Sequence, residues 1–168
     1  KFDPFSPSTF LMVIIMHIVF ILFLVGQFFL YIPYDADEYS SKSDAEVRFE
    51  AYDYRLVRIG SETYKLYVSD DNQKRNQGLS DVQTMYDYEG MAFIFEGSEV
   101  PGFWMKDMNF PLDFVYLQNG IIVDIVEDVS PETYPELIYP SSPATIVIEL
   151  NADQVAVNGA QIGDQVEL

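Results

Sequence analysis

Residues 113–126, DFVYLQNGIIVDIV, carry the clearest structural signal in the chain. Two β-rich runs, Asp113 to Leu117 and Ile121 to Val126, flank Gln118-Asn119-Gly120. A type I′ turn needs positive φ at both central positions, and Asn-Gly is the dipeptide that meets this need best. The stretch therefore predicts an antiparallel β-hairpin.

Other short β-rich runs lie on both sides of this hairpin. Tyr54 to Ile59 and Thr63 to Val68 flank Gly60-Ser61-Glu62, which predicts a second hairpin. Further candidate strands are residues 91–95, 103–106, 145–150 and 165–168, and the proline-rich residues 131–143 are expected to form a loop. Many short strands indicate a mainly β fold, a compact β-sandwich or small barrel with one or two short helices.

One of these helices is expected just after the second hairpin. Asp70 or Asp71 can cap a short helix that runs through Gln77. Gly78 follows at the position that favours a left-handed residue, and the basic side chains of Lys74 and Arg75 suit the last turn.

The N-terminal part is apolar enough to cross a membrane. The 23 residues from Phe10 to Ile32 include no Asp, Glu, Lys or Arg. At about 1.5 Å per residue, a helix of this length covers a hydrocarbon layer of roughly 30 Å. The sequence thus predicts an N-terminal segment (residues 1–9), a transmembrane helix (10–32), a polar tether (33–46) and a soluble β domain (47–168).

The orientation of the predicted span rests on two lysines. Lys1 is the only basic residue before the span, and acidic residues separate the span from Lys42. Because basic residues favour the cytoplasmic side, we expect a single-pass protein of the inner (cytoplasmic) membrane with a cytoplasmic N-terminus. The C-terminal domain is then periplasmic or extracellular.

Three residues of the predicted span are unusual for a lipid-facing helix. Gly26 favours close helix approach, Gln27 can form an interhelical hydrogen bond, and His17 is the only histidine of the chain. They predict contact with other transmembrane subunits. The alternative for His17 is axial ligation of haem or a chlorophyll-type pigment. No other cofactor and no metal site is predicted.

Composition excludes several classes of function. The formal net charge of −18 would repel a phosphate backbone, so nucleic acid is not an expected partner. The chain has no cysteine, and its histidine lies in the predicted span, so the domain lacks the parts of a Cys-His or Ser-His-Asp site. A non-catalytic protein is expected.

The C-terminal two thirds resembles a known family. The motifs that carry the resemblance are Arg75-x-x-Gly78-Leu79, Gly90-Met91-x-Phe93, Phe103-Trp104-Met105-Lys106, Pro111-Leu112-Asp113, Tyr139-x-Ser141, Val147-x-Glu149-Leu150 and Gly163-Asp164. Over residues 65–168 the chain resembles domain of unknown function 192 (DUF192). The resemblance implies a compact, mainly β domain, often exported, with no established reaction. The chain departs from the family pattern at Asp107-Met108 and Ser80.

A candidate binding cluster comes from these motifs: Arg75, Trp104, Lys106 and Asp113. Alternation along a strand would place the Trp104 indole and the Lys106 ammonium on one face. Asp113 could pair with Lys106 or with Arg75. The cluster is then either a structural ion pair under an aromatic lid or a ligand site.

These features together predict a membrane-anchored, non-catalytic accessory or structural subunit of a larger membrane protein complex. Its partners would be membrane lipid and other transmembrane subunits, and its exported β domain would bind protein or ligand. The alternatives are a free-standing, anchored periplasmic domain that binds a small ligand, and an enzyme.

Overall fold

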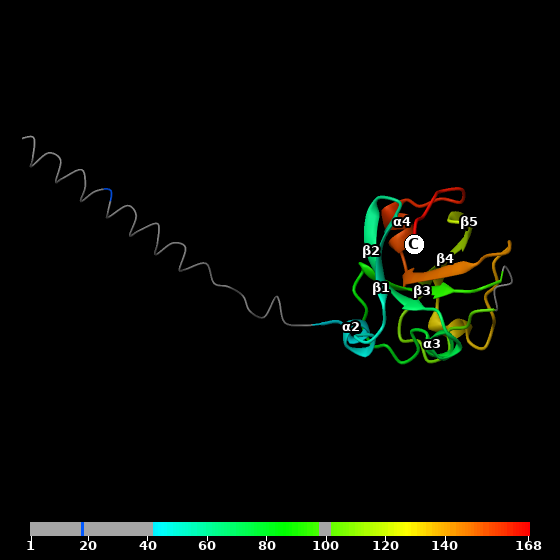
Figure 1. Cartoon of the computed structure of the whole chain (residues 1–168). Coiled ribbons are helices and arrows are strands. Elements are labelled where there is room, and N and C mark those ends of the chain that lie inside the picture. Colours follow the sequence, from blue (N-terminus) through cyan, green and yellow to red (C-terminus); the bar gives the residue numbers. More distant parts are fainter. Residues whose placement is uncertain (1–17, 19–41, 98–101) are drawn as a thin grey trace, which may run out of the picture. The chain divides into compact units, whose positions relative to one another are not determined.

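The computed structural model describes Ile18, residues 42–97 and residues 102–168. Residues 42–168 belong to one compact unit (Figure 1). Its strands are β1 (Tyr54–Ile59), β2 (Glu62–Ser69), β3 (Glu89–Ile94), β4 (Leu112–Gln118), β5 (Ile121–Val129) and β6 (Ile146–Asn151). Its helices are α2 (Asp44–Arg48), α3 (Asn72–Gln77) and α4 (Gln154–Asn158), with a 3-10 turn η1 (Pro131–Thr133).

The strands form one mixed sheet in the order β1-β2-β3-β6-β4-β5. Strands β2 and β3 are parallel, and the other neighbouring pairs are antiparallel. A parallel pair requires a crossover connection, and this one contains α3. The mainly β character is confirmed.

Both predicted hairpins and the predicted helix are confirmed. In the β4–β5 turn, Asn119 and Gly120 have φ of 52° and 75°. In α3, the Asp71 side chain accepts a hydrogen bond from the backbone N–H of Lys74 (2.8 Å), and Gly78 follows with φ of 49°. The turn residues of the hairpin and the cap residues of α3 therefore have the roles that the sequence predicts.

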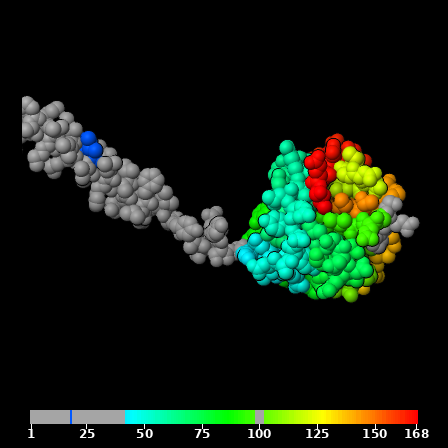
Figure 2. Space-filling view, in the orientation of Figure 1, coloured from blue at the N-terminus to red at the C-terminus, as the bar shows by residue number. Residues whose placement is uncertain are grey.

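The sheet is a single curled layer, which corrects the expectation of a sandwich or small barrel. The C-terminal residues bond to the start of β5: Ile122 N–H donates to Asp164 C=O, and Val166 N–H donates to Gly120 C=O. Figure 2 shows these residues beside the β1–β2 hairpin, and Leu56 and Gln165 line one surface depression. The C-terminal segment thus lies between the two edge strands without completing a ladder.

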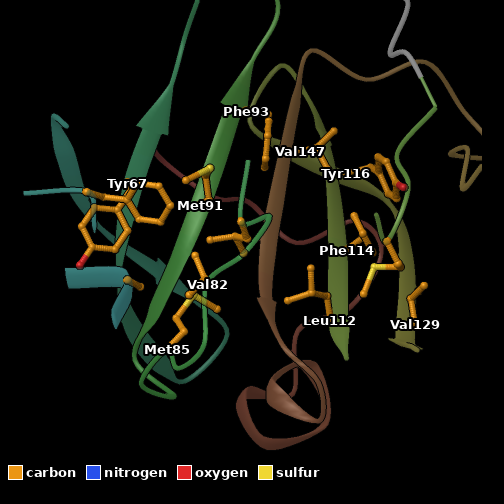
Figure 3. Close-up of a cluster of buried hydrophobic side chains, with 14 of the residues drawn as sticks. Tyr67, Val82, Met85, Met91, Phe93, Leu112, Phe114, Tyr116, Val129 and Val147 are labelled. Atoms are coloured by element: carbon orange, nitrogen blue, oxygen red, sulfur yellow. The ribbon is translucent and has the colours of Figure 1, made fainter. Parts of the chain in front are cut away.

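Two apolar clusters lie on opposite faces of the sheet. One includes Leu66, Val115, Ile148 and Val155, and it packs under α4. The other includes Phe93, Phe114 and Val147, and it is covered by α2 and the residues after α3 (Figure 3). In Figure 1, α3 and α4 lie on opposite sides of the sheet. The alternation of side chains along each strand decides which cluster each residue joins.

Three boundaries differ from the sequence prediction. Residues 103–106 contribute only one bridge, Phe103 with Ile138, and residues 165–168 only one, Gln165 with Ile121. The folded part begins before Val47, because Ser43 caps α2 through the N–H of Glu46 and Ala45 is fully buried. These segments are ordered by long-range contacts, which a local pattern does not show.

Among the described residues, no helix is both long and apolar enough to span a bilayer. Except for Ile18, the predicted span (residues 10–32) lies outside these residues. The transmembrane helix therefore stays a prediction from the sequence.

Candidate functional site: a buried acid in an aromatic cavity

A cavity of about 460 Å³ opens beside α3. One side is formed by α3 and the residues that follow it, and the other by residues 102–108. The remaining lining comes from Phe93 and Phe95 at the end of β3, from Glu149 on β6 and from Leu137 in the loop after η1. Its apolar lining side chains are Leu79, Phe93, Phe95, Phe103, Trp104, Met108 and Leu137, and its polar ones are Asn72, Arg75, Asn76, Gln77, Ser80 and Glu149.

Glu149 brings a carboxyl group into this apolar lining. On β6, Ile146, Ile148 and Leu150 face the cluster under α4, so Glu149 faces the opposite side. Its register partners are Met91 on β3 and Phe114 on β4, both fully buried apolar residues. Glu149 itself is only 5% exposed.

No group within the described part of the chain donates a hydrogen bond to the Glu149 carboxyl group. Burial raises the pKa of Glu149 from 4.5 to about 8, because the charged form loses its hydration and gains no compensating partner. At neutral pH the group is therefore mostly a protonated acid in the folded state. Its charge also contributes to the raised pKa of Tyr116, whose main cause is burial.

The other two buried carboxylates of the described residues are fully satisfied. Glu89 accepts from the hydroxyls of Ser43 (2.5 Å) and Tyr67 (2.6 Å) and from the Tyr86 N–H (2.9 Å). Asp113 accepts from two backbone N–H groups. Buried polar groups are normally hydrogen-bonded, and an unpartnered acid with a displaced pKa marks a candidate functional site. Glu149 is the exception that fits this description.

The aromatic lining of the cavity is held in place from behind. Phe103 packs edge-on against Phe93, with ring centroids 5.0 Å apart, and against Phe114 at 5.7 Å. Its backbone exchanges two hydrogen bonds with Ile138. Edge-to-face aromatic pairs are favourable arrangements. These contacts fix the Phe103 ring in the cavity wall.

Arg75 lies in the last turn of α3 and is fixed by three contacts. Its Nη1 donates to the carbonyl oxygens of Asp70 (2.8 Å) and Ile94 (2.7 Å), and its Nη2 donates to Asn72 Oδ1 (2.7 Å). The guanidinium carbon also lies 5.3 Å from the Phe95 ring centroid. The group is therefore a fixed positive charge in the cavity wall.

The DUF192 family model, described as "Uncharacterized ACR, COG1430", matches residues 55–168. The chain belongs to this family. The match begins within β1, ten residues before the part that the motifs indicated. No curated protein matches.

Two solved structures are similar to this DUF192 domain. One, described as a "putative transcription regulator" from Sinorhizobium meliloti 1021, has 30% identity and a TM-score of 0.65 and covers 69% of this chain and 94% of its own. The other, a protein of unknown function from Novosphingobium aromaticivorans DSM 12444, has 24% identity and a TM-score of 0.62 and covers 68% and 85%. The second supports the fold alone.

The four residues of the predicted binding cluster do not form one group in the DUF192 domain. Arg75 and Trp104 both line the cavity. Lys106 lies outside its lining; the Lys106 ammonium is 3.9 Å from Asp107 and 5.9 Å from the Trp104 ring centroid, and both charged side chains are about half exposed. The Lys106 ammonium thus lies near the Trp104 ring, but no strand forms there and Lys106 does not line the cavity.

Asp113 lies on the other face of the sheet, so the expected pairing with Lys106 or Arg75 is wrong. Its neighbours on β4, Leu112 and Phe114, face the cavity side, and alternation turns Asp113 toward α4. It accepts from the N–H groups of Asp128 and Val155, each at 2.9 Å. Asp113 thus caps α4, whose own N-cap residue makes no side-chain bond.

We expect Asp113→Ala to lower the free energy of unfolding by about 2–4 kcal/mol, because it leaves two N–H donors without an acceptor. Asp113→Asn should cost nearly as much: one amide NH₂ would face a backbone N–H, and neither group can accept. Urea unfolding of the full chain measures both. An unchanged free energy of unfolding in Asp113→Asn would contradict the capping role.

The remaining predicted site residues, His17, Gly26 and Gln27, lie outside the described residues. Helix contact, and haem or pigment ligation by His17, stay predictions. Within the described residues, no group of three His, Cys, Asp or Glu side chains is placed to hold a metal ion.

Glu149 stands within a family motif, but the sequence pattern alone does not mark it as a site residue. Its sequence signal is an acid inside the β-branched run Thr145-Ile-Val-Ile-Glu-Leu150. A charged residue in such a run is either at an exposed face or buried for a reason, and the choice depends on the neighbouring strands. Those neighbours, β3 and β4, come from distant parts of the chain.

Proposed function

We propose that this DUF192 domain is a non-catalytic binding module that holds a small organic molecule in the Glu149 cavity. The observation that carries the proposal is an unpartnered, buried acid in a cavity lined by aromatic side chains. Sites for small molecules are typically apolar cavities of about 300–1,000 Å³ with a few convergent polar groups. The cavity near Glu149 matches this pattern in volume, lining and polar content.

The sequence adds the cellular setting of the proposal. The predicted span at residues 10–32 would tether the binding module to the inner membrane, with the domain outside. Gly26, Gln27 and His17 would then contact other transmembrane subunits, so the chain would act as an accessory subunit that supplies ligand binding to a larger complex.

A non-catalytic role agrees with the chemistry of the domain. Residues 42–168 contain no histidine and no cysteine. Glu149 is a single acid, whereas the usual nucleophile–base arrangements need two or three groups within hydrogen-bond reach. Binding rather than turnover is the simpler use of the cavity.

Trp104 gives a direct test, because it is the only tryptophan of the chain and lines the cavity. The full chain in mild detergent is titrated with a library of small cationic, neutral and anionic compounds. We expect some of these compounds to cause a saturable change in Trp104 fluorescence. Leu137→Ala, at the cavity, should weaken binding about 3- to 10-fold through lost apolar contact. Val157→Ala, an exposed aliphatic residue on α4, is the matched control and should have no effect. If no compound saturates the signal, the binding role is wrong.

A further inference from the structure

We infer, on the basis of the proposed ligand-binding role, that the cavity takes an organic cation with N–H groups, a primary amine or a guanidine. The cationic group would bond to the Glu149 carboxylate, and the apolar part of the ligand would lie against Phe93, Phe103 and Trp104. Neither the fold nor the family description assigns such a ligand.

The Glu149 carboxyl group lacks hydrogen-bond donors from the described part of the chain. A carboxylate offers two oxygens that accept hydrogen bonds, and burial without donors is costly. Glu89 shows how the same fold satisfies a buried glutamate, with three donors from its own chain. Since the described residues supply Glu149 with none, the donors it needs are those of a ligand in the cavity.

The surroundings of Glu149 favour a positively charged ligand. Charge-assisted hydrogen bonds from an ammonium or guanidinium are about twice as strong as neutral ones. Aromatic faces also attract cations, most strongly when water is excluded. The net charge of −18 further raises the local concentration of cations around the chain. All three effects favour a cation over a neutral molecule of the same shape.

Arg75 is the feature that could favour an anion instead. Its guanidinium already donates to two backbone carbonyls and to Asn72, and it forms no ion pair with Glu149 within 4.0 Å. Because these three oxygens already accept from the Arg75 guanidinium, it has fewer N–H groups left to bind an anionic ligand. An anionic probe of matched shape therefore belongs in the experiment.

The experiment compares compounds that differ only in the polar group: phenethylamine and phenethylguanidine as cations, phenethyl alcohol as neutral, and hydrocinnamate as anion. Binding to the full chain in mild detergent is followed by Trp104 fluorescence and by calorimetry. We expect the cations to bind at least about 10-fold more tightly than the other two. In Glu149→Gln, which keeps the shape and removes the charge, the cations should lose about 10- to 100-fold and the alcohol almost nothing.

Proton release gives a second readout. Because burial raises the pKa of Glu149 to about 8, a cation bound at pH 7 must displace a proton. Cation affinity should rise about tenfold per pH unit up to pH 8 and then level off, and Glu149→Gln should abolish both the rise and the release. Other titratable or charged groups on this face include Tyr116 and Tyr67, whose pKa values are raised mainly by burial. Glu89, which accepts from the Tyr67 hydroxyl, and the Arg75 guanidinium lie on this face as well.

The possible outcomes separate the two proposals. If the alcohol or hydrocinnamate binds as tightly as the cations, or if Glu149→Gln leaves cation affinity unchanged, the cation inference is wrong and the ligand-binding role stands. If neither these compounds nor any library member binds, both are wrong. Preferential cation binding that depends on Glu149 and releases a proton supports both.

Discussion

Glu149→Gln should make the full chain more stable by about 5 kcal/mol at pH 9 and change its stability little at pH 4.5. The substitution keeps the size of the side chain but removes the ionisable group. In the wild type, burial raises the pKa of Glu149 from 4.5 to about 8. Each unit of displacement corresponds to about 1.4 kcal/mol of linked stability, which gives the expected difference.

Proton binding by Glu149 decides whether the free energy of unfolding rises or falls with pH. Between pH 4.5 and 8 the folded state keeps the Glu149 proton while the unfolded chain has lost it. The free energy of unfolding therefore falls as pH rises through this interval and levels off above pH 8. Urea unfolding at several pH values measures the difference between variant and wild type, in which the repulsion among the many surface acids cancels.

Glu167→Gln is the matched control, because it removes an exposed carboxyl group near the C-terminus. Its stability curve should run parallel to that of the wild type. Parallel curves for Glu149→Gln and wild type would mean that Glu149 is solvated or paired, and the site would lose its physical basis.

A destabilising acid is informative about function. Functional sites often contain residues that lower the stability of the folded protein. A ligand that satisfies such a residue restores the lost stability when it binds. A bound cation would supply the missing hydrogen bonds, so ligand binding should raise wild-type stability most at high pH. The same carboxyl group thus links the stability profile to the proposed role of the cavity.

The local elements of the fold could be predicted because their determinants lie close together in sequence. Asn119-Gly120 specifies its turn through positive φ, and Asp71 with Gly78 specifies both ends of α3. A few adjacent residues are sufficient for each of these, because the backbone groups that they satisfy are their own neighbours.

The order of the strands could not be predicted in this way. The parallel pairing of β2 with β3, and the insertion of β6 between β3 and β4, depend on contacts across the chain. Without that order, the face of each strand cannot be assigned. For this reason the sequence pattern wrongly pairs Asp113 with Lys106 or Arg75, and it does not distinguish Glu149 from the other residues of its motif.

Glu89 provides the second large expected effect. Glu89→Ala should lower the free energy of unfolding by about 3–6 kcal/mol, because it leaves three donors unsatisfied in a fully buried place. These donors belong to Ser43, Tyr67 and Tyr86, so the loss should be greatest where α2 packs on the sheet. Urea unfolding gives the total, and hydrogen exchange at the α2 amides locates it.

Glu89→Gln separates hydrogen-bond loss from charge loss. Tyr67 alone donates to Oε1, and a phenolic hydroxyl can accept as well as donate. The Gln NH₂ can therefore take the Oε1 place while the remaining oxygen still accepts from Ser43 and from the Tyr86 N–H. We expect Glu89→Gln to cost less than half as much as Glu89→Ala, whereas Asp113→Asn, which faces two backbone N–H groups, has no such rescue. Equal losses in Glu89→Gln and Glu89→Ala would show that the charge of Glu89, rather than its acceptors, holds α2 on the sheet.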